Sequence, residues 1–153
     1  WDVDLYEKIE DSLLSKTKDF HYKISGFDKS PSAVKKAIEN IKNANLEEFI
    51  KIKHEDFFKT QKGIDNELMI VFNPPYGERL DLDFKSFYKN IGNTFKHKYS
   101  GSTAWFITSN LEALKHVGLR PSRKIKLFNA KLESRFVKYD IYQGTRKVHK
   151  QKK

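Results

Sequence analysis

The chain has 153 residues, which is enough for one hydrophobic core. Its 30 Lys and Arg exceed its 20 Asp and Glu, so the net charge is +10. This charge favours a polyanionic partner, and nucleic acid more than a membrane. It contains no cysteine, which excludes disulfides, thiolate metal sites and cysteine nucleophiles. It also has no apolar stretch long enough to cross a bilayer and no signal peptide, so we expect a cytoplasmic protein.

Apolar residues recur with helical or strand spacing along nearly the whole chain. In chain order, this spacing predicts a helix over 2–16, a strand over 22–27, a helix that begins at 31, strands over 49–53 and 68–72, a helix over 84–95, a strand over 104–108, a short helix from 110 to 118, and strands over 122–128 and 133–142. Ser30 and Pro31 fit the cap and the first position of the second helix.

The alternation of strands and helices favours an α/β fold with an open, mainly parallel sheet and helices on both faces. The last two strands are close enough to pair as a hairpin, which introduces an antiparallel strand. We expect one domain over residues 1–144, followed by a disordered basic tail over residues 145–153.

Polar residues follow three successive predicted strands. Asp28, Asp56 and Asn73 each lie at or just past a strand end, and the ends of parallel strands share one edge of a sheet, so the three side chains are expected to converge on one crevice. A carboxylate in the place of Asp28 suits ribose hydroxyls, because it offers two acceptor oxygens. Each residue also has an alternative structural role. Asp28 would be a turn residue before Ser30, and Asp56 would be an acid at a strand end beside core phenylalanines.

The loop after the strand 68–72 carries the most chemistry. That strand is apolar throughout, which is typical of a parallel strand buried on both faces. Pro74 and Pro75 remove two amide donors, Asn73 adds a side-chain acceptor, and Tyr76 adds a flat ring. Acceptors beside an aromatic ring suit the amino group of an extruded base. A tight turn with a surface tyrosine is the alternative.

The Asn-Pro-Pro-Tyr run resembles the loop of amino-directed methyltransferases that use S-adenosylmethionine. The longer string NPPYGERL resembles the ribosomal RNA guanine-N2 methyltransferases of the RlmL type. Trp1 and three further segments carry the same resemblance: ISGFDKS at 24–30 is similar to the family's second-strand cofactor motif, HEDFF at 54–58 to its third-strand motif, and KLFNAKLESRF at 126–136 to its terminal hairpin.

This resemblance implies a Rossmann-like class I methyltransferase sheet with a terminal antiparallel hairpin. It also implies S-adenosyl-L-methionine as cofactor, ribosomal RNA as partner, and no metal. The residues that it points to are Asn73, Pro74, Pro75 and Tyr76 for catalysis, Asp28, Lys29, Asp56, Phe57 and Asn73 for the cofactor, and Arg79, Lys131 and Arg135 for RNA. An ion pair with Glu78 is the alternative for Arg79.

The sequence departs from the family at two places. The family's first cofactor motif, which provides the central strand and its glycine-rich loop, is lacking, and we expect it in an upstream segment together with an RNA-binding THUMP domain. Ala130 stands where the family has glycine, so the hairpin is expected to turn differently. Residues 1–144 then form a partial catalytic domain that is inactive alone.

Other functions are also compatible with these residues. The same loop serves enzymes that methylate adenine N6 or the N5 of a protein glutamine, and a non-catalytic RNA-binding fragment would use only the basic surface. The five histidines are scattered and no HExxH occurs, which gives a hydrolase or a metalloenzyme little support, and the sequence contains no GxxxxGK[ST] phosphate loop either.

Overall fold

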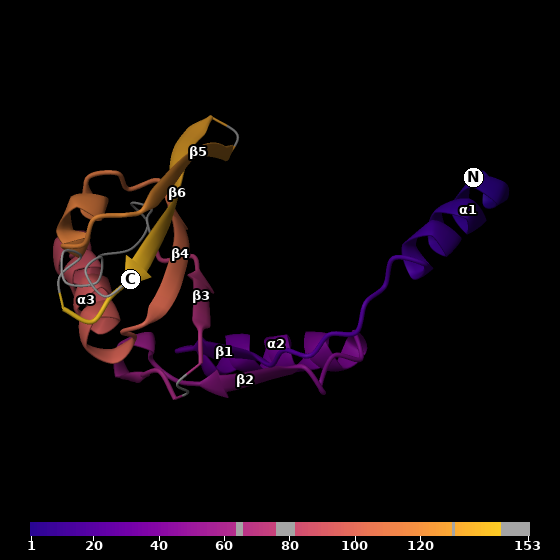
Figure 1. Cartoon of the computed structure of the whole chain (residues 1–153), viewed down its shortest axis with the longest axis horizontal. Coiled ribbons are helices and arrows are strands. Elements are labelled where there is room, and N and C mark those ends of the chain that lie inside the picture. Colours follow the sequence, from indigo (N-terminus) through magenta and orange to yellow (C-terminus); the bar gives the residue numbers. More distant parts are fainter. Residues whose placement is uncertain (64–65, 76–81, 130, 145–153) are drawn as a thin grey trace. The chain divides into compact units, whose positions relative to one another are not determined.

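The structure, a computed structural model, describes residues 1–63, 66–75, 82–129 and 131–144 (Figure 1). Its helices and strands are α1 (Val3–Leu14), β1 (Ile24–Asp28), α2 (Pro31–Asn43), β2 (Ile50–His54), η1 (Phe57–Lys59), β3 (Leu68–Phe72), α3 (Phe84–Lys98), β4 (Ser102–Thr108), η2 (Ala113–Val117), β5 (Arg123–Asn129) and β6 (Leu132–Ile141). The chain divides into two compact units, residues 1–57 and 58–153, which are described separately.

The first unit is built on a parallel pair of strands. β1 and β2 run side by side from the Ile24–Ile50 pair to the Asp28–His54 pair. Helix α2 begins as predicted, with Pro31 in its first turn and the Ser30 hydroxyl accepting a hydrogen bond from the Ala33 amide at 3.4 Å. The short β–α–β path therefore places the carboxyl ends of β1 and β2 next to each other.

The second unit contains a four-stranded sheet in the order β3-β4-β6-β5. β3 and β4 are parallel, whereas β6 runs antiparallel to both of its neighbours, β4 and β5. The predicted terminal hairpin is confirmed. β3, β4 and β5 therefore run in the same direction and β6 is the one antiparallel strand among the described residues, so the prediction of a mainly parallel sheet with an antiparallel strand from the hairpin is also confirmed for this unit.

Helix α3 covers one face of this sheet, and its side chains pack against those of β4 and β6 in the core (Figure 1). Its fully buried Tyr88 and Phe95 contact Phe72, Phe106 and Tyr139 through ring edges and tilted rings, at centroid distances of 6.0 to 6.2 Å. Burial raises the pKa of the Tyr139 hydroxyl, and the neighbouring Tyr88 raises it further, so Tyr139 stays neutral.

The opposite face of β3 is open in the described residues. Met69 and Val71 are 67% and 64% exposed, although the apolar run predicted burial on both faces. That prediction of a fully buried strand is wrong for the described part of the chain, because α3 packs on only one of the two faces. None of the described helices is long and apolar enough to cross a membrane, and the cytoplasmic location stays a prediction.

Candidate active site

The carboxyl ends of β1 and β2 bring together the residues predicted to hold a cofactor. Asp28 ends β1, and one of its carboxylate oxygens accepts a hydrogen bond from the Ser30 amide at 2.7 Å. Its carbonyl accepts from the Glu55 amide at 3.0 Å, which ties the end of β1 to the residue after β2. Asp28 therefore does form the turn that precedes α2, and its exposed carboxylate lies at the sheet edge where a ligand would bind.

Asp56 lies two residues past the end of β2, within reach of Lys29. The Lys29 ammonium and the Asp56 carboxylate are 3.7 Å apart, with exposed side-chain fractions of 81% and 24%. Since Lys29 is largely solvated, this ion pair holds Asp56 only weakly. The Lys29 carbonyl is 3.0 Å from the His54 ring nitrogen Nε2, and Phe57 begins η1 directly after Asp56. Asp28, Lys29, Asp56 and Phe57 thus share one edge, as the strand ends predicted.

Asn73, Pro74 and Pro75 follow β3 directly. Asn73 is exposed, Pro74 is buried and Pro75 is half-buried, so the run leaves the sheet with its amide side chain at the surface. A series of three hydrogen bonds connects Asn110 to this run. The backbone amide of Asn110 donates to the Thr108 hydroxyl at 3.0 Å, and the Thr108 and Tyr88 hydroxyls are 2.6 Å apart. The Tyr88 hydroxyl donates to the Pro75 carbonyl at 3.5 Å.

These contacts fix the direction of the protons. A tyrosine hydroxyl has one proton, so if Tyr88 donates to Pro75, Thr108 must donate to Tyr88. A chain of donors then runs from the end of β4 to the carbonyl of the Asn-Pro-Pro loop. Sequence reasoning missed Tyr88 and Thr108, and the only available signal was a tyrosine and a threonine among apolar core positions.

The terminal hairpin holds the two RNA-binding candidates that the structure describes. Lys131 is exposed at the turn, whereas Arg135 is paired with Glu133 at 2.6 Å. Glu133 also pairs with Lys126 at 2.6 Å, and the hydrogen bond from Lys126, assisted by Arg135, lowers the pKa of Glu133. At neutral pH this carboxylate therefore partly neutralises two of the hairpin's cations.

Two predicted site residues, Tyr76 and Arg79, lie outside the described residues, as do Glu78 and Ala130. Asp28 and Asp56 belong to the first unit and Asn73 to the second, so the convergence of the three on one crevice stays a prediction. Among the described residues, no group of three His, Cys, Asp or Glu side chains could hold a metal ion.

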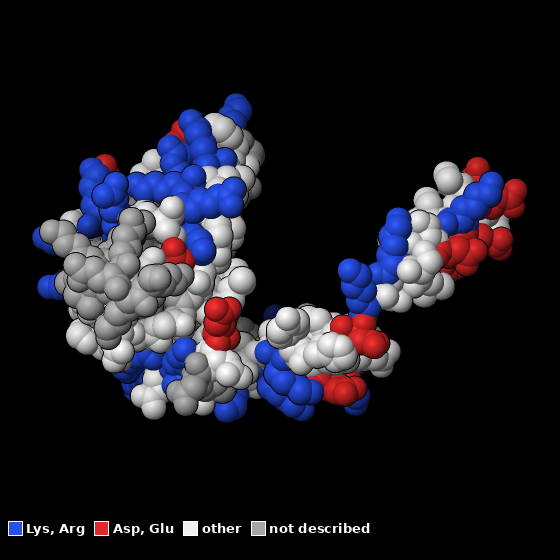
Figure 2. Space-filling model, in the orientation of Figure 1, with Lys and Arg blue, Asp and Glu red and all other residues white. Residues whose placement is uncertain are grey.

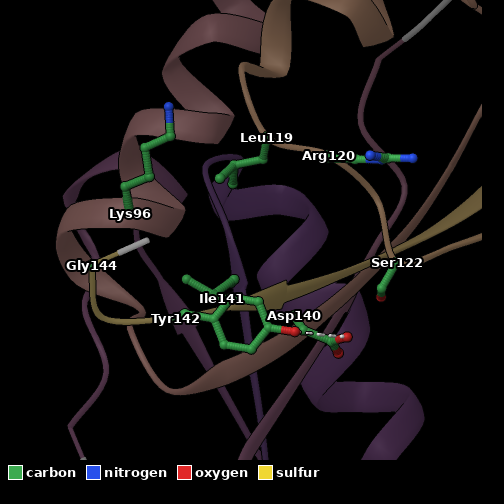
Figure 3. Close-up of a pocket in the computed structure, with 8 residues that line it drawn as sticks. All are labelled: Lys96, Leu119, Arg120, Ser122, Asp140, Ile141, Tyr142 and Gly144. Atoms are coloured by element: carbon green, nitrogen blue, oxygen red, sulfur yellow. Dashed lines mark hydrogen bonds between the residues drawn. The ribbon is translucent and has the colours of Figure 1, made fainter. Parts of the chain in front are cut away.

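A cavity of about 210 Å³ lies away from all of these residues (Figure 3). Ile141, in its wall, pairs with Ser102 at the start of β4, so the cavity lies at the opposite edge of the sheet from Asn73. Its other walls are formed by Lys96, Leu119, Arg120, Ser122, Asp140, Tyr142 and Gly144. Partial burial works to raise the pKa of Asp140, but hydrogen bonds from Lys138, Ser122 and Tyr142 outweigh it and lower the value.

The strand order, the antiparallel terminal hairpin and the polar residues at the carboxyl strand ends are those of a Rossmann-like methyltransferase. Solved structures agree. A possible methylase from Clostridium difficile 630 aligns with a TM-score of 0.79 and 27% identity, over 95% of this chain and 39% of that one. SMU.472, a putative methyltransferase complexed with SAH, has the same fold, with a TM-score of 0.79, 24% identity, and coverage of 95% of this chain and 38% of that one.

The chain belongs to the RMKL-like methyltransferase domain family, which it matches over residues 5–138, and this confirms the resemblance to RlmL-type enzymes. It is 31% identical over 141 residues to the ribosomal RNA large subunit methyltransferase K/L of Hahella chejuensis, covering 89% of this chain and 19% of that protein. With the enzyme of the same name from Syntrophotalea carbinolica, the identity is 34% over 121 residues, 76% of this chain and 17% of that protein. The chain thus spans about a fifth of the length of these relatives.

Proposed function

We propose that the protein carrying this chain transfers a methyl group from S-adenosylmethionine to an exocyclic amino group of a base in ribosomal RNA, and that the acceptor is guanine N2 of the large-subunit RNA. The Asn73-Pro74-Pro75 run at the carboxyl end of β3 is the observation that carries this proposal. The relatives named ribosomal RNA large subunit methyltransferase K/L support the choice of substrate class.

The residues at the ends of β1 and β2 fit the cofactor by their chemistry. Asp28 and Asp56 offer carboxylate acceptors for hydroxyl and amino groups, and Phe57 offers a ring for the adenine. When bound, S-adenosylmethionine supplies an activated methyl group, so the protein has to bind, orient and polarise. An upstream segment with the glycine-rich cofactor motif and a THUMP domain stays a prediction.

The loop after β3 acts on the acceptor. An exocyclic amino nitrogen is a poor nucleophile, because its lone pair is delocalised into the ring of the base. The amide oxygen of Asn73 and the Pro74 carbonyl accept its two protons and favour a more pyramidal nitrogen. Tyr76 stacks on the base and keeps it aligned. The chain of donors from Thr108 through Tyr88 to the Pro75 carbonyl holds the loop in place.

The test replaces Asn73 in the intact enzyme. Asn73→Ala is expected to abolish methyl transfer while leaving cofactor affinity largely intact and folding unchanged. Asn73→Asp keeps an acceptor oxygen at the same place and should retain part of the activity. Asn93→Ala removes an exposed amide from α3 and is the matched control.

The product is identified by digesting the methylated RNA to nucleosides and analysing them by mass spectrometry. N2-methylguanosine supports the proposed acceptor, whereas N6-methyladenosine keeps the enzyme class and rejects guanine. Wild-type turnover in a folded Asn73→Ala variant rejects the role of the loop.

A further inference from the structure

The terminal hairpin extends past the rest of the sheet at the edge that carries Asn73. β4 pairs with β6 only as far as Thr108 and Arg135, whereas β5 and β6 stay paired to Asn129 and Leu132. Asn73 follows Phe72, which lies opposite Phe106 near that same end of β4. The tip of the hairpin and the Asn-Pro-Pro loop therefore lie at the same edge of the sheet, separated by the ends of β4 and β6.

The hairpin and the loop before it form a surface rich in cations. Residues 120–138 contain a single acid, Glu133, and seven cations: Arg120, Arg123, Lys124, Lys126, Lys131, Arg135 and Lys138. Figure 2 shows Lys and Arg side chains gathered over β5 and β6. Lys126 and Arg135 are paired with Glu133, and Lys138 is paired with Asp140, whereas Arg120, Arg123, Lys124 and Lys131 form no ion pair within the described part of the chain and are available to a polyanion.

One large aromatic side chain is exposed among these cations. Phe128 is 63% exposed, and the Lys126 ammonium lies 5.0 Å from the centre of its ring. Phe128 and Lys126 alternate with Leu127 along β5, so they share the face of the hairpin that also carries Glu133 and Arg135. A single exposed apolar residue is common on protein surfaces, so it is the position of this ring among cations, on the hairpin at the sheet edge that carries Asn73, that makes it suitable for stacking on a base.

Single-stranded RNA fits this combination of chemistry. An aromatic ring stacks on any unpaired base, and cations beside it bind the phosphates on either side. A protein partner would need several acidic groups to match a surface with seven cations and one acid. A duplex would satisfy the cations but offers Phe128 no base face.

We propose that the tip of this hairpin binds unpaired RNA nucleotides that flank the methylated base, with one of them stacked on Phe128 and the phosphates held by the cations of β5 and β6. This inference rests on the proposed function and names the form of its substrate: a loop, bulge or single strand. Three strand spacings, about 14 Å, separate β5 from β3, so the stacked nucleotide lies at the same sheet edge as the base whose amino group meets Asn73, but is not its immediate neighbour.

The test measures RNA affinity of the intact protein by fluorescence anisotropy. The probes are a short fluorescein-labelled RNA strand of mixed sequence and the same strand in a duplex. Phe128→Leu keeps an apolar side chain without a ring face, and Phe128→Trp keeps the ring. Leu127→Ala removes apolar surface from the opposite face of the same strand and is the matched control.

Phe128→Leu is expected to weaken binding of the single strand by about 5- to 150-fold, without changing the dependence of the affinity on salt. Phe128→Trp and Leu127→Ala should bind as the wild type does, and duplex affinity should be unchanged in all three. Lys124→Gln should instead reduce the slope of log affinity against log salt by about 0.7 for the single strand, as expected for one lost phosphate contact.

Equal affinity of Phe128→Leu and wild type would overturn the proposal, and so would an equal loss on the duplex. Both results would mean that Phe128 meets no base, as when another part of the protein covers it. Methyl transfer is measured in parallel with the Asn73 variants. If Phe128→Leu loses affinity for the single strand but the wild-type protein does not methylate RNA, the proposed function is rejected and the RNA-binding role of the hairpin is retained.

Discussion

Replacing Tyr88 by phenylalanine tests whether the core of the second unit positions the Asn-Pro-Pro loop. The substitution keeps the aromatic packing of the fully buried side chain and removes only its hydroxyl. That oxygen is 2.6 Å from the Thr108 hydroxyl and donates to the Pro75 carbonyl at 3.5 Å. Its loss therefore leaves one buried hydroxyl and one loop carbonyl without this partner.

The structure indicates how the effect divides between stability and turnover. A buried donor left unsatisfied costs about 1–3 kcal/mol, and Thr108 is fully buried, so we expect unfolding free energy to fall by that amount. The bond to Pro75 is long and therefore weak. Losing about 1.4 kcal/mol of positioning would lower kcat about 10-fold. Cofactor affinity should stay largely intact, because all of the predicted cofactor residues except Asn73 lie in the other unit.

Tyr99→Phe is the matched control. Tyr99 is also buried, and its hydroxyl forms a hydrogen bond with Thr60, but it lies just before β4, at the opposite edge of the sheet from Asn73. Both variants should lose similar stability in urea denaturation, and only Tyr88→Phe should lose turnover. A destabilised Tyr88→Phe enzyme with wild-type kcat would refute the positioning role, as would an equal fall in kcat for Tyr99→Phe.

Two further predictions concern the first unit and the core. Asp28→Ala should weaken S-adenosylmethionine binding by about 1.5–3 kcal/mol in calorimetry of the intact enzyme. Ser30→Ala should instead cost about 1 kcal/mol of stability and leave the affinity unchanged. An Asp28→Ala variant that binds the cofactor as tightly as the wild type would show that Asp28 is only a turn residue. Gly92→Ala would place a methyl group 1.7 Å from the Val117 carbonyl oxygen and should destabilise by about 1–3 kcal/mol in urea. Gly63→Ala meets nothing within 4 Å and should not destabilise.

The parts of the fold that sequence reasoning predicted are those set by local patterns. The strand over 68–72 has the predicted bounds, Ser30 caps α2, and the Asn110 side chain accepts a hydrogen bond from the Ala113 amide at the start of η2. Each depends on residues within a few positions of one another. The same holds for Asp28, whose turn with Ser30 spans two residues.

The parts that were missed depend on tertiary contacts. Tyr88 meets Pro75 and Thr108 across 13 and 20 residues of sequence, and no local pattern encodes which hydroxyls will meet in a core. The exposure of Met69 and Val71 is of the same kind. An apolar strand predicts burial of both faces, but what covers a face is determined by elements elsewhere.

The antiparallel direction of β6 matters for the proposed function. A strand parallel to β4 would begin at the amino edge, and the turn before it would lie far from Asn73. β6 is antiparallel, so it begins beyond Thr108 and ends opposite Ser102. This reversal delivers the tip of the hairpin, with Phe128 and its neighbouring cations, to the edge where the Asn-Pro-Pro loop leaves β3. The antiparallel strand thus allows one sheet edge to present both the methylation loop and an RNA-binding surface.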